Sequence, residues 1–313
     1  MATVLCVVGP TATGKTKMGV ALAKHFNGEV VSVDSMQIYR GMAVGTAAPT
    51  AEEMEGVPHH MVAVADPAES WSVARYVQAA DACVQDILSR GKLPVLVGGT
   101  GLYLDALIRG TDFAAGAQGT EIRQALQRRA QAEGIEVLLE ELRKIDPAAA
   151  EKLHLRDEKR IIRALEVWQE TGRTITEHDA QERQRPPRYD ALYIGLDFED
   201  RQDLRDRIDR RVDAMVAQGL LAEVEALLSG GLPRDATALQ AIGYKQFLAV
   251  AEGTATTEEA IAEVKLRSRQ YAKRQLTWLR RNPDIFWVRW QRDPNFPEGL
   301  QKATEYLHSR GLC

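Results

Sequence analysis

The feature that most constrains this chain is the segment Gly9–Thr16, which reads GPTATGKT and fits the phosphate-loop pattern G-x-x-x-x-G-K-[ST]. An apolar run, Val4–Val8, precedes it and a stretch with helical spacing, Lys17–His25, follows it. The strand–loop–helix context that the pattern needs is therefore present. In such a loop the backbone N–H groups and the helix N-terminus point at an anion.

The loop predicts a polyphosphate site with bound Mg²⁺. Lys15 would contact phosphate oxygens and Thr16 would offer its hydroxyl to the metal. The pattern alone leaves open whether the ligand is a nucleotide such as ATP. The residues expected to bind the phosphates are Gly9, Thr11, Ala12, Thr13, Gly14, Lys15 and Thr16.

Strands alternate with helices through the first third of the chain. The apolar runs Val4–Val8, Glu29–Val33 and Leu93–Val97 are separated by helical stretches, of which Trp71–Arg90 has the clearest spacing. This alternation predicts an α/β fold, with a parallel sheet covered by helices on both faces. In such sheets the binding groups lie at the carboxyl ends of the strands.

Two polar residues directly follow the second and third of these runs. Asp34 follows one and Thr100 follows the other, so we expect both to meet the phosphate loop in one crevice. Position alone allows Asp34 to be a helix N-cap, or a general base or magnesium ligand. Ser35 and Gln37 beside it favour a functional role, because they form hydrogen bonds and a Gln amide can read a purine edge.

The composition and the residue spacing of the chain change after Gly110. Residues 111–119 read as a linker, and a helical region follows, broken near the two prolines at 186–187. We therefore predict a catalytic core of residues 1–111 and 191–313, interrupted by a helical insertion domain of residues 112–190. The helices expected after residue 112 are Glu121–Glu133, Ile135–Ile145, Glu158–Thr171, Arg201–Gln218, Leu221–Leu228, Ala238–Ala251 and Thr257–Arg281, with strands at Tyr193–Asp197 and Ile285–Trp290.

The charge of the chain is unevenly distributed. The net charge is −4, yet the stretch Val264–Pro283 carries seven Lys/Arg and no acid. A charged run on a helix is often only a solvated face. Because Tyr271 and Trp278 lie within it, the run also fits a nucleic-acid surface, on which cations meet phosphates and aromatic rings stack on bases. Lys273 and Arg274 are its candidate contacts.

The composition fits a cytoplasmic protein. The three cysteines, Cys6, Cys83 and Cys313, are scattered and lack metal-ligand spacing, as expected of reduced thiols. No apolar run approaches the roughly 20 residues of a membrane span, and the N-terminus does not resemble a signal peptide.

Seven segments in the same order resemble the tRNA dimethylallyltransferases, also called tRNA isopentenyltransferases, of the compact bacterial type. They are GPTATGKT (Gly9–Thr16), DSMQIY (Asp34–Tyr39), PHH (Pro58–His60), VGGTGLYL (Val97–Leu104), IRALEV (Ile162–Val167), AIGYKQ (Ala241–Gln246) and YAKRQLTW (Tyr271–Trp278). The resemblance implies a core similar to P-loop nucleotide kinases and a helical insertion that clasps the anticodon stem-loop. It also implies that the loop holds dimethylallyl diphosphate, whose dimethylallyl group is transferred to N6 of the adenosine 3′ to the anticodon.

The resemblance gives roles to individual residues. Asp34 is our candidate for the base that takes a proton from the adenine amine, and the resemblance implies that Thr100 positions this amine. Arg207 and Arg211 resemble positions that add positive charge to the diphosphate, although they could equally be surface charges paired with Asp206 and Asp209. The residues expected to contact tRNA are Asp34, Ser35, Met36, Gln37, Thr100, Arg123, Lys159, Arg160, Ile161, Ile162, Arg163, Gln240, Ala241, Ile242, Gly243, Tyr244, Lys245, Lys273 and Arg274.

The chain departs from the family at one of these positions and leaves two classes of alternative open. Lys159 stands where the family commonly has Gln, which puts that one contact in doubt. We expect His59 and His60 to be structural, since no carboxylate or Cys lies at ligand spacing, and we expect a monomer. The alternatives are a P-loop kinase acting on a small molecule and a nucleotide-gated RNA-binding module without transfer chemistry.

Overall fold

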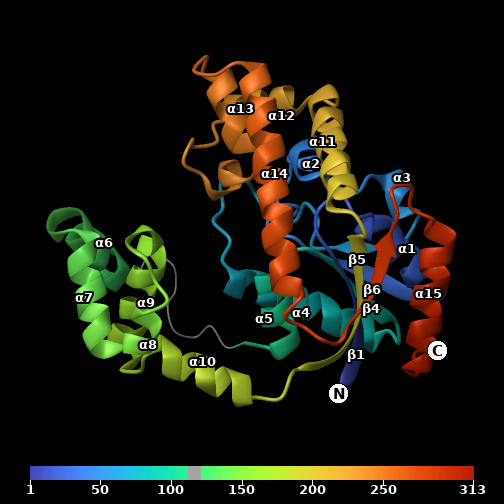
Figure 1. Ribbon diagram of the computed structural model, residues 1–313, viewed down its shortest axis with the longest axis horizontal. Helices are drawn as coiled ribbons and strands as arrows, with labels where there is room; N and C mark the ends of the chain where they lie inside the picture. The colour runs from blue at the N-terminus through green and yellow to red at the C-terminus, as the bar shows by residue number, and fades with distance from the viewer. Residues whose placement is uncertain (112–120) are drawn as a thin grey trace. The chain divides into compact units, whose positions relative to one another are not determined.

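The computed structural model describes residues 1–111 and 121–313, which form two compact units (Figure 1). The first unit contains residues 1–108 and 188–313, and the second contains residues 109–187. Except for residue 111, the predicted linker lies outside the described residues, and so does the predicted boundary at 112. The chain returns to the first unit at residue 188, just before the strand that begins at Tyr189.

The first unit is built on a six-stranded sheet in the order β3-β2-β4-β1-β5-β6, and every neighbouring pair is parallel. This confirms the predicted α/β class. The central strands are near-continuous apolar runs because helices cover both of their faces. The strands are β1 (Ala2–Val8), β2 (Gly28–Val33), β3 (His59–His60), β4 (Leu93–Gly98), β5 (Tyr189–Phe198) and β6 (Ile285–Trp290).

The register of the sheet aligns the carboxyl ends of three strands. Gly98 of β4 is paired with Val8 of β1 on one side and with Val33 of β2 on the other. The loops that follow β2, β4 and β1 therefore begin side by side at one edge of the sheet. They carry Asp34, Thr100 and the phosphate loop.

Helices pack on this sheet and on one another. Helix α1 packs on β2 and β4, α11 packs on α14, and the C-terminal helix α15 lies beside β6 and α1 (Figure 1). The helices of the first unit are α1 (Lys15–His25), α2 (Ala43–Thr46), α3 (Ala51–Met54), α4 (Val73–Ser89), α5 (Gly101–Arg109), α11 (Arg201–Ala217), α12 (Leu220–Ser229), the 3-10 helix Thr237–Gln240, α13 (Tyr244–Ala251), α14 (Thr257–Leu279) and α15 (Phe296–Ser309).

One helical prediction in this unit was wrong, and helices α5 and α15 were not predicted. The single helix expected over residues 238–251 is divided, because Gly243 has a φ of +100° and interrupts the helical backbone. Helix α15 was not predicted, although Asn295 caps it by accepting a hydrogen bond from the Glu298 amide and a proline stands in its first turn.

The second unit is entirely helical in its described part, and the three helices expected there have the predicted bounds. A fourth long helix, α10, was missed, although Thr174 and Glu177 form a capping box at its start. A buried carboxylate ties this unit together: Asp146 accepts hydrogen bonds from the amides of Ala149 and Thr176. The elements are α6 (Glu121–Glu133), α7 (Ile135–Ile145), α8 (Pro147–Ala150), the 3-10 helix Leu155–Asp157, α9 (Glu158–Thr171) and α10 (Ile175–Gln184).

Candidate active site

The phosphate loop links β1 to α1, and glycine is required at both of its ends. A Cβ on Gly9 would lie 2.5 Å from the carbonyl oxygen of Leu196, so a side chain has no room there. Gly14 has a φ of +86°, in the left-handed region that glycine adopts without strain. Because α1 begins at Lys15, the free N–H groups of its first turn are available to an anion.

Lys15 is half-buried at the start of α1. Its ammonium donates a hydrogen bond of 2.7 Å to the carbonyl of Pro10. Burial and the nearby charge of Arg211 lower the pKa of Lys15 to about 7, against the opposing influence of Asp34. The side chain is therefore poorly solvated as a cation and would be stabilised by an anion in the loop.

Three side chains from distant parts of the chain hold the phosphate loop in place. Gln275 accepts a hydrogen bond from the Thr11 amide at 3.0 Å, and Trp290 donates one to the Thr13 carbonyl at 2.9 Å. Arg207 donates one to the Ala12 carbonyl at 3.1 Å. Sequence reasoning did not assign a role to Gln275 or Trp290. Gln275 lies within a segment quoted for the family resemblance, whereas nothing local distinguishes Trp290.

Arg207 and Arg211 of α11 both belong to this site. Arg207 contacts the loop directly, and the charge of Asp34 acts on Arg211. Burial lowers the pKa of both guanidinium groups. The alternative pairing with surface acids is not found, because Asp206 accepts from Gln202 and Asp209 pairs with Arg269 at 2.7 Å.

Asp34 directly follows β2, and one of its two carboxylate oxygens is engaged in hydrogen bonds. Its Oδ1 accepts hydrogen bonds from the amides of Met36 at 2.8 Å and Gln37 at 3.2 Å, which fixes a turn rather than the start of a helix. Its Oδ2 makes no hydrogen bond to the described residues. This arrangement orients the carboxylate and leaves one oxygen able to accept a proton.

Thr100 lies between β4 and α5 with a buried hydroxyl. Within the described ranges, its Oγ1 has no partner in hydrogen-bonding geometry. Tyr271 of α14 is close by: burial and the charge of Asp34 raise the pKa of its phenol, while the Thr100 hydroxyl acts in the opposite direction. A buried polar atom without a partner is costly to folding, so this hydroxyl is a candidate for contact with a substrate.

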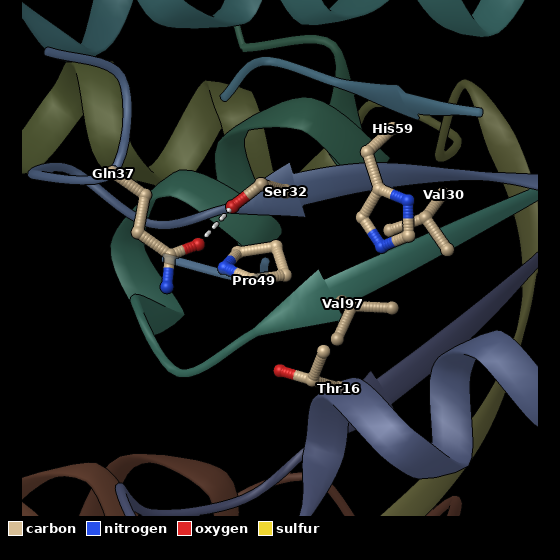
Figure 2. Close-up of a pocket in the computed structure, with 7 residues that line it drawn as sticks. All are labelled: Thr16, Val30, Ser32, Gln37, Pro49, His59 and Val97. Atoms are coloured by element: carbon tan, nitrogen blue, oxygen red, sulfur yellow. Dashed lines mark hydrogen bonds between the residues drawn. The ribbon is translucent and has the colours of Figure 1, made fainter. Parts of the chain in front are cut away.

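Gln37 is engaged within the protein. Its Oε1 accepts a hydrogen bond from the Ser32 hydroxyl at 2.9 Å (Figure 2), and its amide nitrogen lies 3.4 Å and 3.3 Å from the carbonyl oxygens of Thr46 and Ala47. The amide thus ties β2 to the short helix α2. In this structure it is not free to read a base edge.

A small cavity adjoins Gln37 and the first turn of α1, as Figure 2 shows. Thr16 of α1 and His59 of β3 both line it. The residues that line it are Thr16, Val30, Ser32, Gln37, Pro49, His59 and Val97.

His59 and His60 have structural partners, as expected. Nδ1 of His59 lies 2.9 Å from the Val57 carbonyl, and burial lowers the pKa of this ring. Nε2 of His60 lies 2.8 Å from the buried carboxylate of Glu29. Across residues 1–111 and 121–313, no cluster of three or more His, Cys, Asp or Glu side chains could hold a metal ion.

The segment expected to contact tRNA around Gly243 is only partly at the surface. Gln240 and Lys245 are exposed, whereas Ala241 and Tyr244 are buried, and Ile242 is half-buried. Tyr244 has no exposed surface because its ring packs on Gly45 and its hydroxyl donates to Glu223. The Tyr244 side chain therefore supports α2 within the protein, and contact between this segment and tRNA stays a prediction.

The acid-free run on α14 is partly neutralised by acids on other segments. Lys265 and Arg269 form ion pairs with Asp213 and Asp209 of α11, Arg280 pairs with Asp197, and Arg267 pairs with Glu263 one turn before it. Lys273, Arg274 and Arg281 are exposed and have no ion pair in the part of the chain that the structure describes. Arg274 lies over the ring of Tyr271 and Arg281 over that of Trp278.

In the second unit, the predicted contacts divide by burial. Arg123 and Arg163 both donate to the fully buried carboxylate of Glu166, at 2.5 and 2.9 Å. Lys159 and Arg160 are exposed. Ile161 and Ile162 are buried in the helical core of the unit, and their contact with tRNA stays a prediction.

Among the described residues, no helix is long and apolar enough to cross a membrane.

The chain matches a family described as IPP transferase over residues 37–282, and one described as isopentenyl transferase over residues 2–63.

Relatives and solved structures cover nearly the whole chain. A tRNA dimethylallyltransferase of Acetivibrio thermocellus is 41% identical over 100% of this chain and 99% of its own length, and one of Halalkalibacterium halodurans is 48% identical over 97% and 96%. The crystal structure of the full-length tRNA isopentenylpyrophosphate transferase of Bacillus halodurans covers 99% of this chain and 96% of its own, with 42% identity and a TM-score of 0.74. A eukaryotic dimethylallyltransferase acting on tRNA covers 99% of this chain and 80% of its own, with 28% identity and a TM-score of 0.83.

Proposed function

The chain belongs to the IPP transferase family, and we propose that it transfers a dimethylallyl group from dimethylallyl diphosphate to N6 of an adenosine in tRNA. Relatives that share more than two-fifths of its residues over nearly the whole chain are named for this reaction. The more specific part of the proposal is that the target is the adenosine 3′-adjacent to the anticodon. The observation that carries the proposed transfer reaction is the site itself. A cationic phosphate loop, an oriented carboxylate and an unpartnered hydroxyl meet at the ends of three neighbouring strands.

The phosphate loop would hold the diphosphate. Lys15, Arg207 and Arg211 supply positive charge around amides that point into the loop, and all three are partly buried. As the allylic C–O bond breaks, negative charge grows on the leaving diphosphate, and these groups stabilise it most at that moment. Fixed charges in a poorly solvated site are worth more than the same charges in water.

The loop also fits Mg²⁺. Mg²⁺ is usually held by a few protein oxygens together with substrate phosphates and water, and the Thr16 hydroxyl at the start of α1 is such an oxygen. The absence of a carboxylate cluster from the described residues agrees with a metal that depends on the diphosphate. When bound, the ion would add positive charge beside the leaving group.

Asp34 and Thr100 would serve the acceptor. The lone pair of the adenine N6 amine is delocalised into the ring, so the amine attacks better if its proton is removed as the C–N bond forms. Oδ2 of Asp34 would take that proton, while the Thr100 hydroxyl would position the amine. One C–N bond forms and one C–O bond breaks, and the diphosphate leaves with the bonding electron pair.

The adenosine must leave its stack to reach this site. Flipping costs least for a base that is already unpaired, and single-stranded loops are where proteins read RNA bases directly. Lys273, Arg274, Gln240 and Lys245 of the first unit are exposed and could contact the RNA backbone. In the second unit the corresponding candidates are Arg123, Lys159, Arg160 and Arg163.

The small-molecule kinase is not favoured, because the relatives that cover the chain are named for transfer to tRNA. An RNA-binding module without chemistry would have no use for an oriented carboxylate beside a phosphate loop. The tRNA substrate and the three free cysteines together support a cytoplasmic location.

The test is to incubate the purified protein with Mg²⁺, dimethylallyl diphosphate and unmodified tRNA, then to measure the masses of the released nucleosides. We expect a dimethylallyl mass gain on adenosine that disappears in Asp34→Ala. Asp284→Ala, which removes an exposed carboxylate from the same unit, should keep it. Loss of tRNA binding along with activity in Asp34→Ala would overturn the role of this residue as base, and no mass gain in the unaltered protein would overturn the function.

A further inference from the structure

One side chain, Gln275, connects the diphosphate side of the site to the acceptor side. Its Oε1 accepts a hydrogen bond from the Thr11 amide at 3.0 Å, and its Nε2 donates one to the Gly99 carbonyl at 3.0 Å. Thr11 belongs to the phosphate loop, and Gly99 directly precedes Thr100. The side chain that makes these bonds comes from α14 and is 6% exposed.

Both bonds depend on the carboxamide group and on the length of the side chain. An N–H on one side requires an acceptor and a carbonyl on the other requires a donor, and a single amide supplies both. Glutamate lacks the donor when it is ionised, and asparagine is one methylene too short. The approach is also close: a Cβ on Gly99 would lie 2.1 Å from the Gln275 nitrogen, so a side chain at this position would displace the amide.

The sheet alone does not fix these two segments. Pairing between β1 and β4 ends at Val8 and Gly98, whereas Thr11 and Thr100 lie beyond it, in loops. The nearby Tyr271, one helical turn before Gln275, also faces both Gln275 and Thr100. Among the described residues, the Gln275 amide is hydrogen-bonded to both loops, at Thr11 on one side and at Gly99 on the other.

We propose that Gln275 is a positioning residue for dimethylallyl transfer, which sets the distance between the diphosphate loop and the Thr100 side of the acceptor site. This inference rests on the proposed function. Transfer requires the attacking nitrogen and the allylic carbon to be about 3–3.5 Å apart, and a displacement of about 1 Å can reduce a rate by about 100-fold. Gln275 would act through Thr11 and Gly99, without touching either substrate.

The first experiment compares Gln275→Met with the unaltered protein. Methionine has a similar volume but can make neither bond. With both substrates saturating, we expect the single-turnover rate of transfer to fall by about 10- to 100-fold, while the Kd for tRNA and the Kd for dimethylallyl diphosphate each change by less than about threefold. Gln270→Met is the matched control, because Gln270 is an exposed residue of the same helix. A rate within about threefold of the unaltered protein, or losses of affinity as large as the loss of rate, would overturn the proposal.

The second experiment uses Gln275→Glu and remains informative if the methionine variant does not fold. A protonated Glu side chain can accept from the Thr11 amide and donate to the Gly99 carbonyl, as the amide does, whereas the ionised form cannot donate. The transfer rate of the variant divided by that of the unaltered protein should therefore rise as the pH falls from about 9 to about 6. Taking the ratio removes the pH dependence that the two proteins have in common. A ratio that does not depend on pH would overturn the positioning role, whereas absence of transfer in the unaltered protein would instead overturn the proposed function.

Discussion

Arg207 donates a hydrogen bond from Nε to the carbonyl oxygen of Ala12, over 3.1 Å, and so attaches helix α11 to the phosphate loop. Ala12 itself has a φ of +66°, in the left-handed region that non-glycine residues seldom occupy. The arginine thus holds a strained residue in place and brings a partly desolvated positive charge to the loop.

Arg207→Gln should weaken binding of dimethylallyl diphosphate by about tenfold or more, since a hydrogen bond to a charged group contributes about 1.5–3 kcal/mol. Calorimetric titration of the diphosphate measures this. Arg210→Gln is the control, because Arg210 is exposed on the same helix and its described hydrogen bond is to the Asp206 carbonyl one turn earlier. Equal effects of the two variants would mean that α11 acts through its general charge and not through the contact with Ala12.

The pKa of Lys15, lowered to about 7 by burial and by the charge of Arg211, predicts a pH dependence of diphosphate binding. A bound anion favours the charged ammonium, so binding should raise this pKa and take up a proton at pH values above 7. The affinity should therefore fall as the pH rises, by up to about tenfold per pH unit above about 7. Binding titrations at several pH values test this, with Lys15→Met as the reference for ionisation of the ligand itself. Equal slopes for both proteins would contradict the assignment.

Lys15→Ala should, in addition, abolish productive use of the diphosphate while leaving tRNA affinity nearly unchanged. The lysine lies in the phosphate loop, and the exposed cations of α14 lie on a different segment. Filter binding of tRNA measures the affinity. A large loss of tRNA binding would count against a role confined to the diphosphate.

Thr100→Val should separate stability from activity. The Thr100 hydroxyl is buried without a partner in hydrogen-bonding geometry, and replacing such a group by a methyl of similar shape is nearly neutral or stabilising. We expect an unchanged or slightly higher melting temperature together with a fall in the transfer rate of at least about tenfold. A lower melting temperature with full activity would show that the hydroxyl serves the fold.

The structural elements that could be predicted from the sequence are those that depend on local residue patterns. The strands β1, β2 and β4 are short apolar runs, and their order along the chain implies a parallel sheet whose loops meet at one edge. Helix α15 could have been found from its cap at Asn295. These signals need no knowledge of residues far away in the sequence.

The features that could not be predicted from the sequence depend on contacts between residues that are far apart along the chain. Gln275 and Trp290 are 264 and 277 residues away from the loop atoms they bind. The α14 cations carry less free charge than the sequence suggests, because acids of α11 pack against them in space. Tyr244 lies in a segment that resembles a tRNA contact, yet its ring is buried against Gly45, which only the packing reveals.

The lowered pKa of Glu29 predicts that the folded protein loses stability in acid. The pKa of this nearly buried carboxyl is held well below its usual range by Arg90 first, then by Lys92 and His60. A carboxyl whose pKa is depressed by folding stabilises the protein above its unfolded pKa of about 4.5, and this contribution is lost as the pH falls below that value.

Glu29→Gln should therefore reduce the free energy of unfolding at neutral pH. We expect about 1–2 kcal/mol, because the cationic partners are partly exposed and screened by water. Urea unfolding at neutral pH and near pH 3 tests this, and the gap between the two proteins should narrow in acid. Glu55→Gln, which breaks an exposed pair with Lys24, should change little at either pH. A gap that is constant with pH would show that packing, not charge, is what Glu29 contributes.

The salt dependence of tRNA binding should identify which cations of α14 meet RNA phosphates. Lys273 and Arg274 are exposed and have no ion pair within the described ranges, whereas Arg267 is paired with Glu263. Each phosphate contact adds about 0.7 to the slope of log K against log salt for single-stranded RNA. The double variant Lys273→Gln, Arg274→Gln should therefore weaken binding several-fold at low salt and reduce the slope by about 1 to 1.5.

Arg267→Gln should leave that slope nearly unchanged, because this cation is already neutralised by its neighbour. Competition binding of unmodified tRNA over a range of salt concentrations provides both numbers. If the double variant kept the slope and the affinity of the unaltered protein, Lys273 and Arg274 would be a solvated surface. RNA binding would then depend on other cations, among which Lys159 and Arg160 of the second unit are exposed candidates.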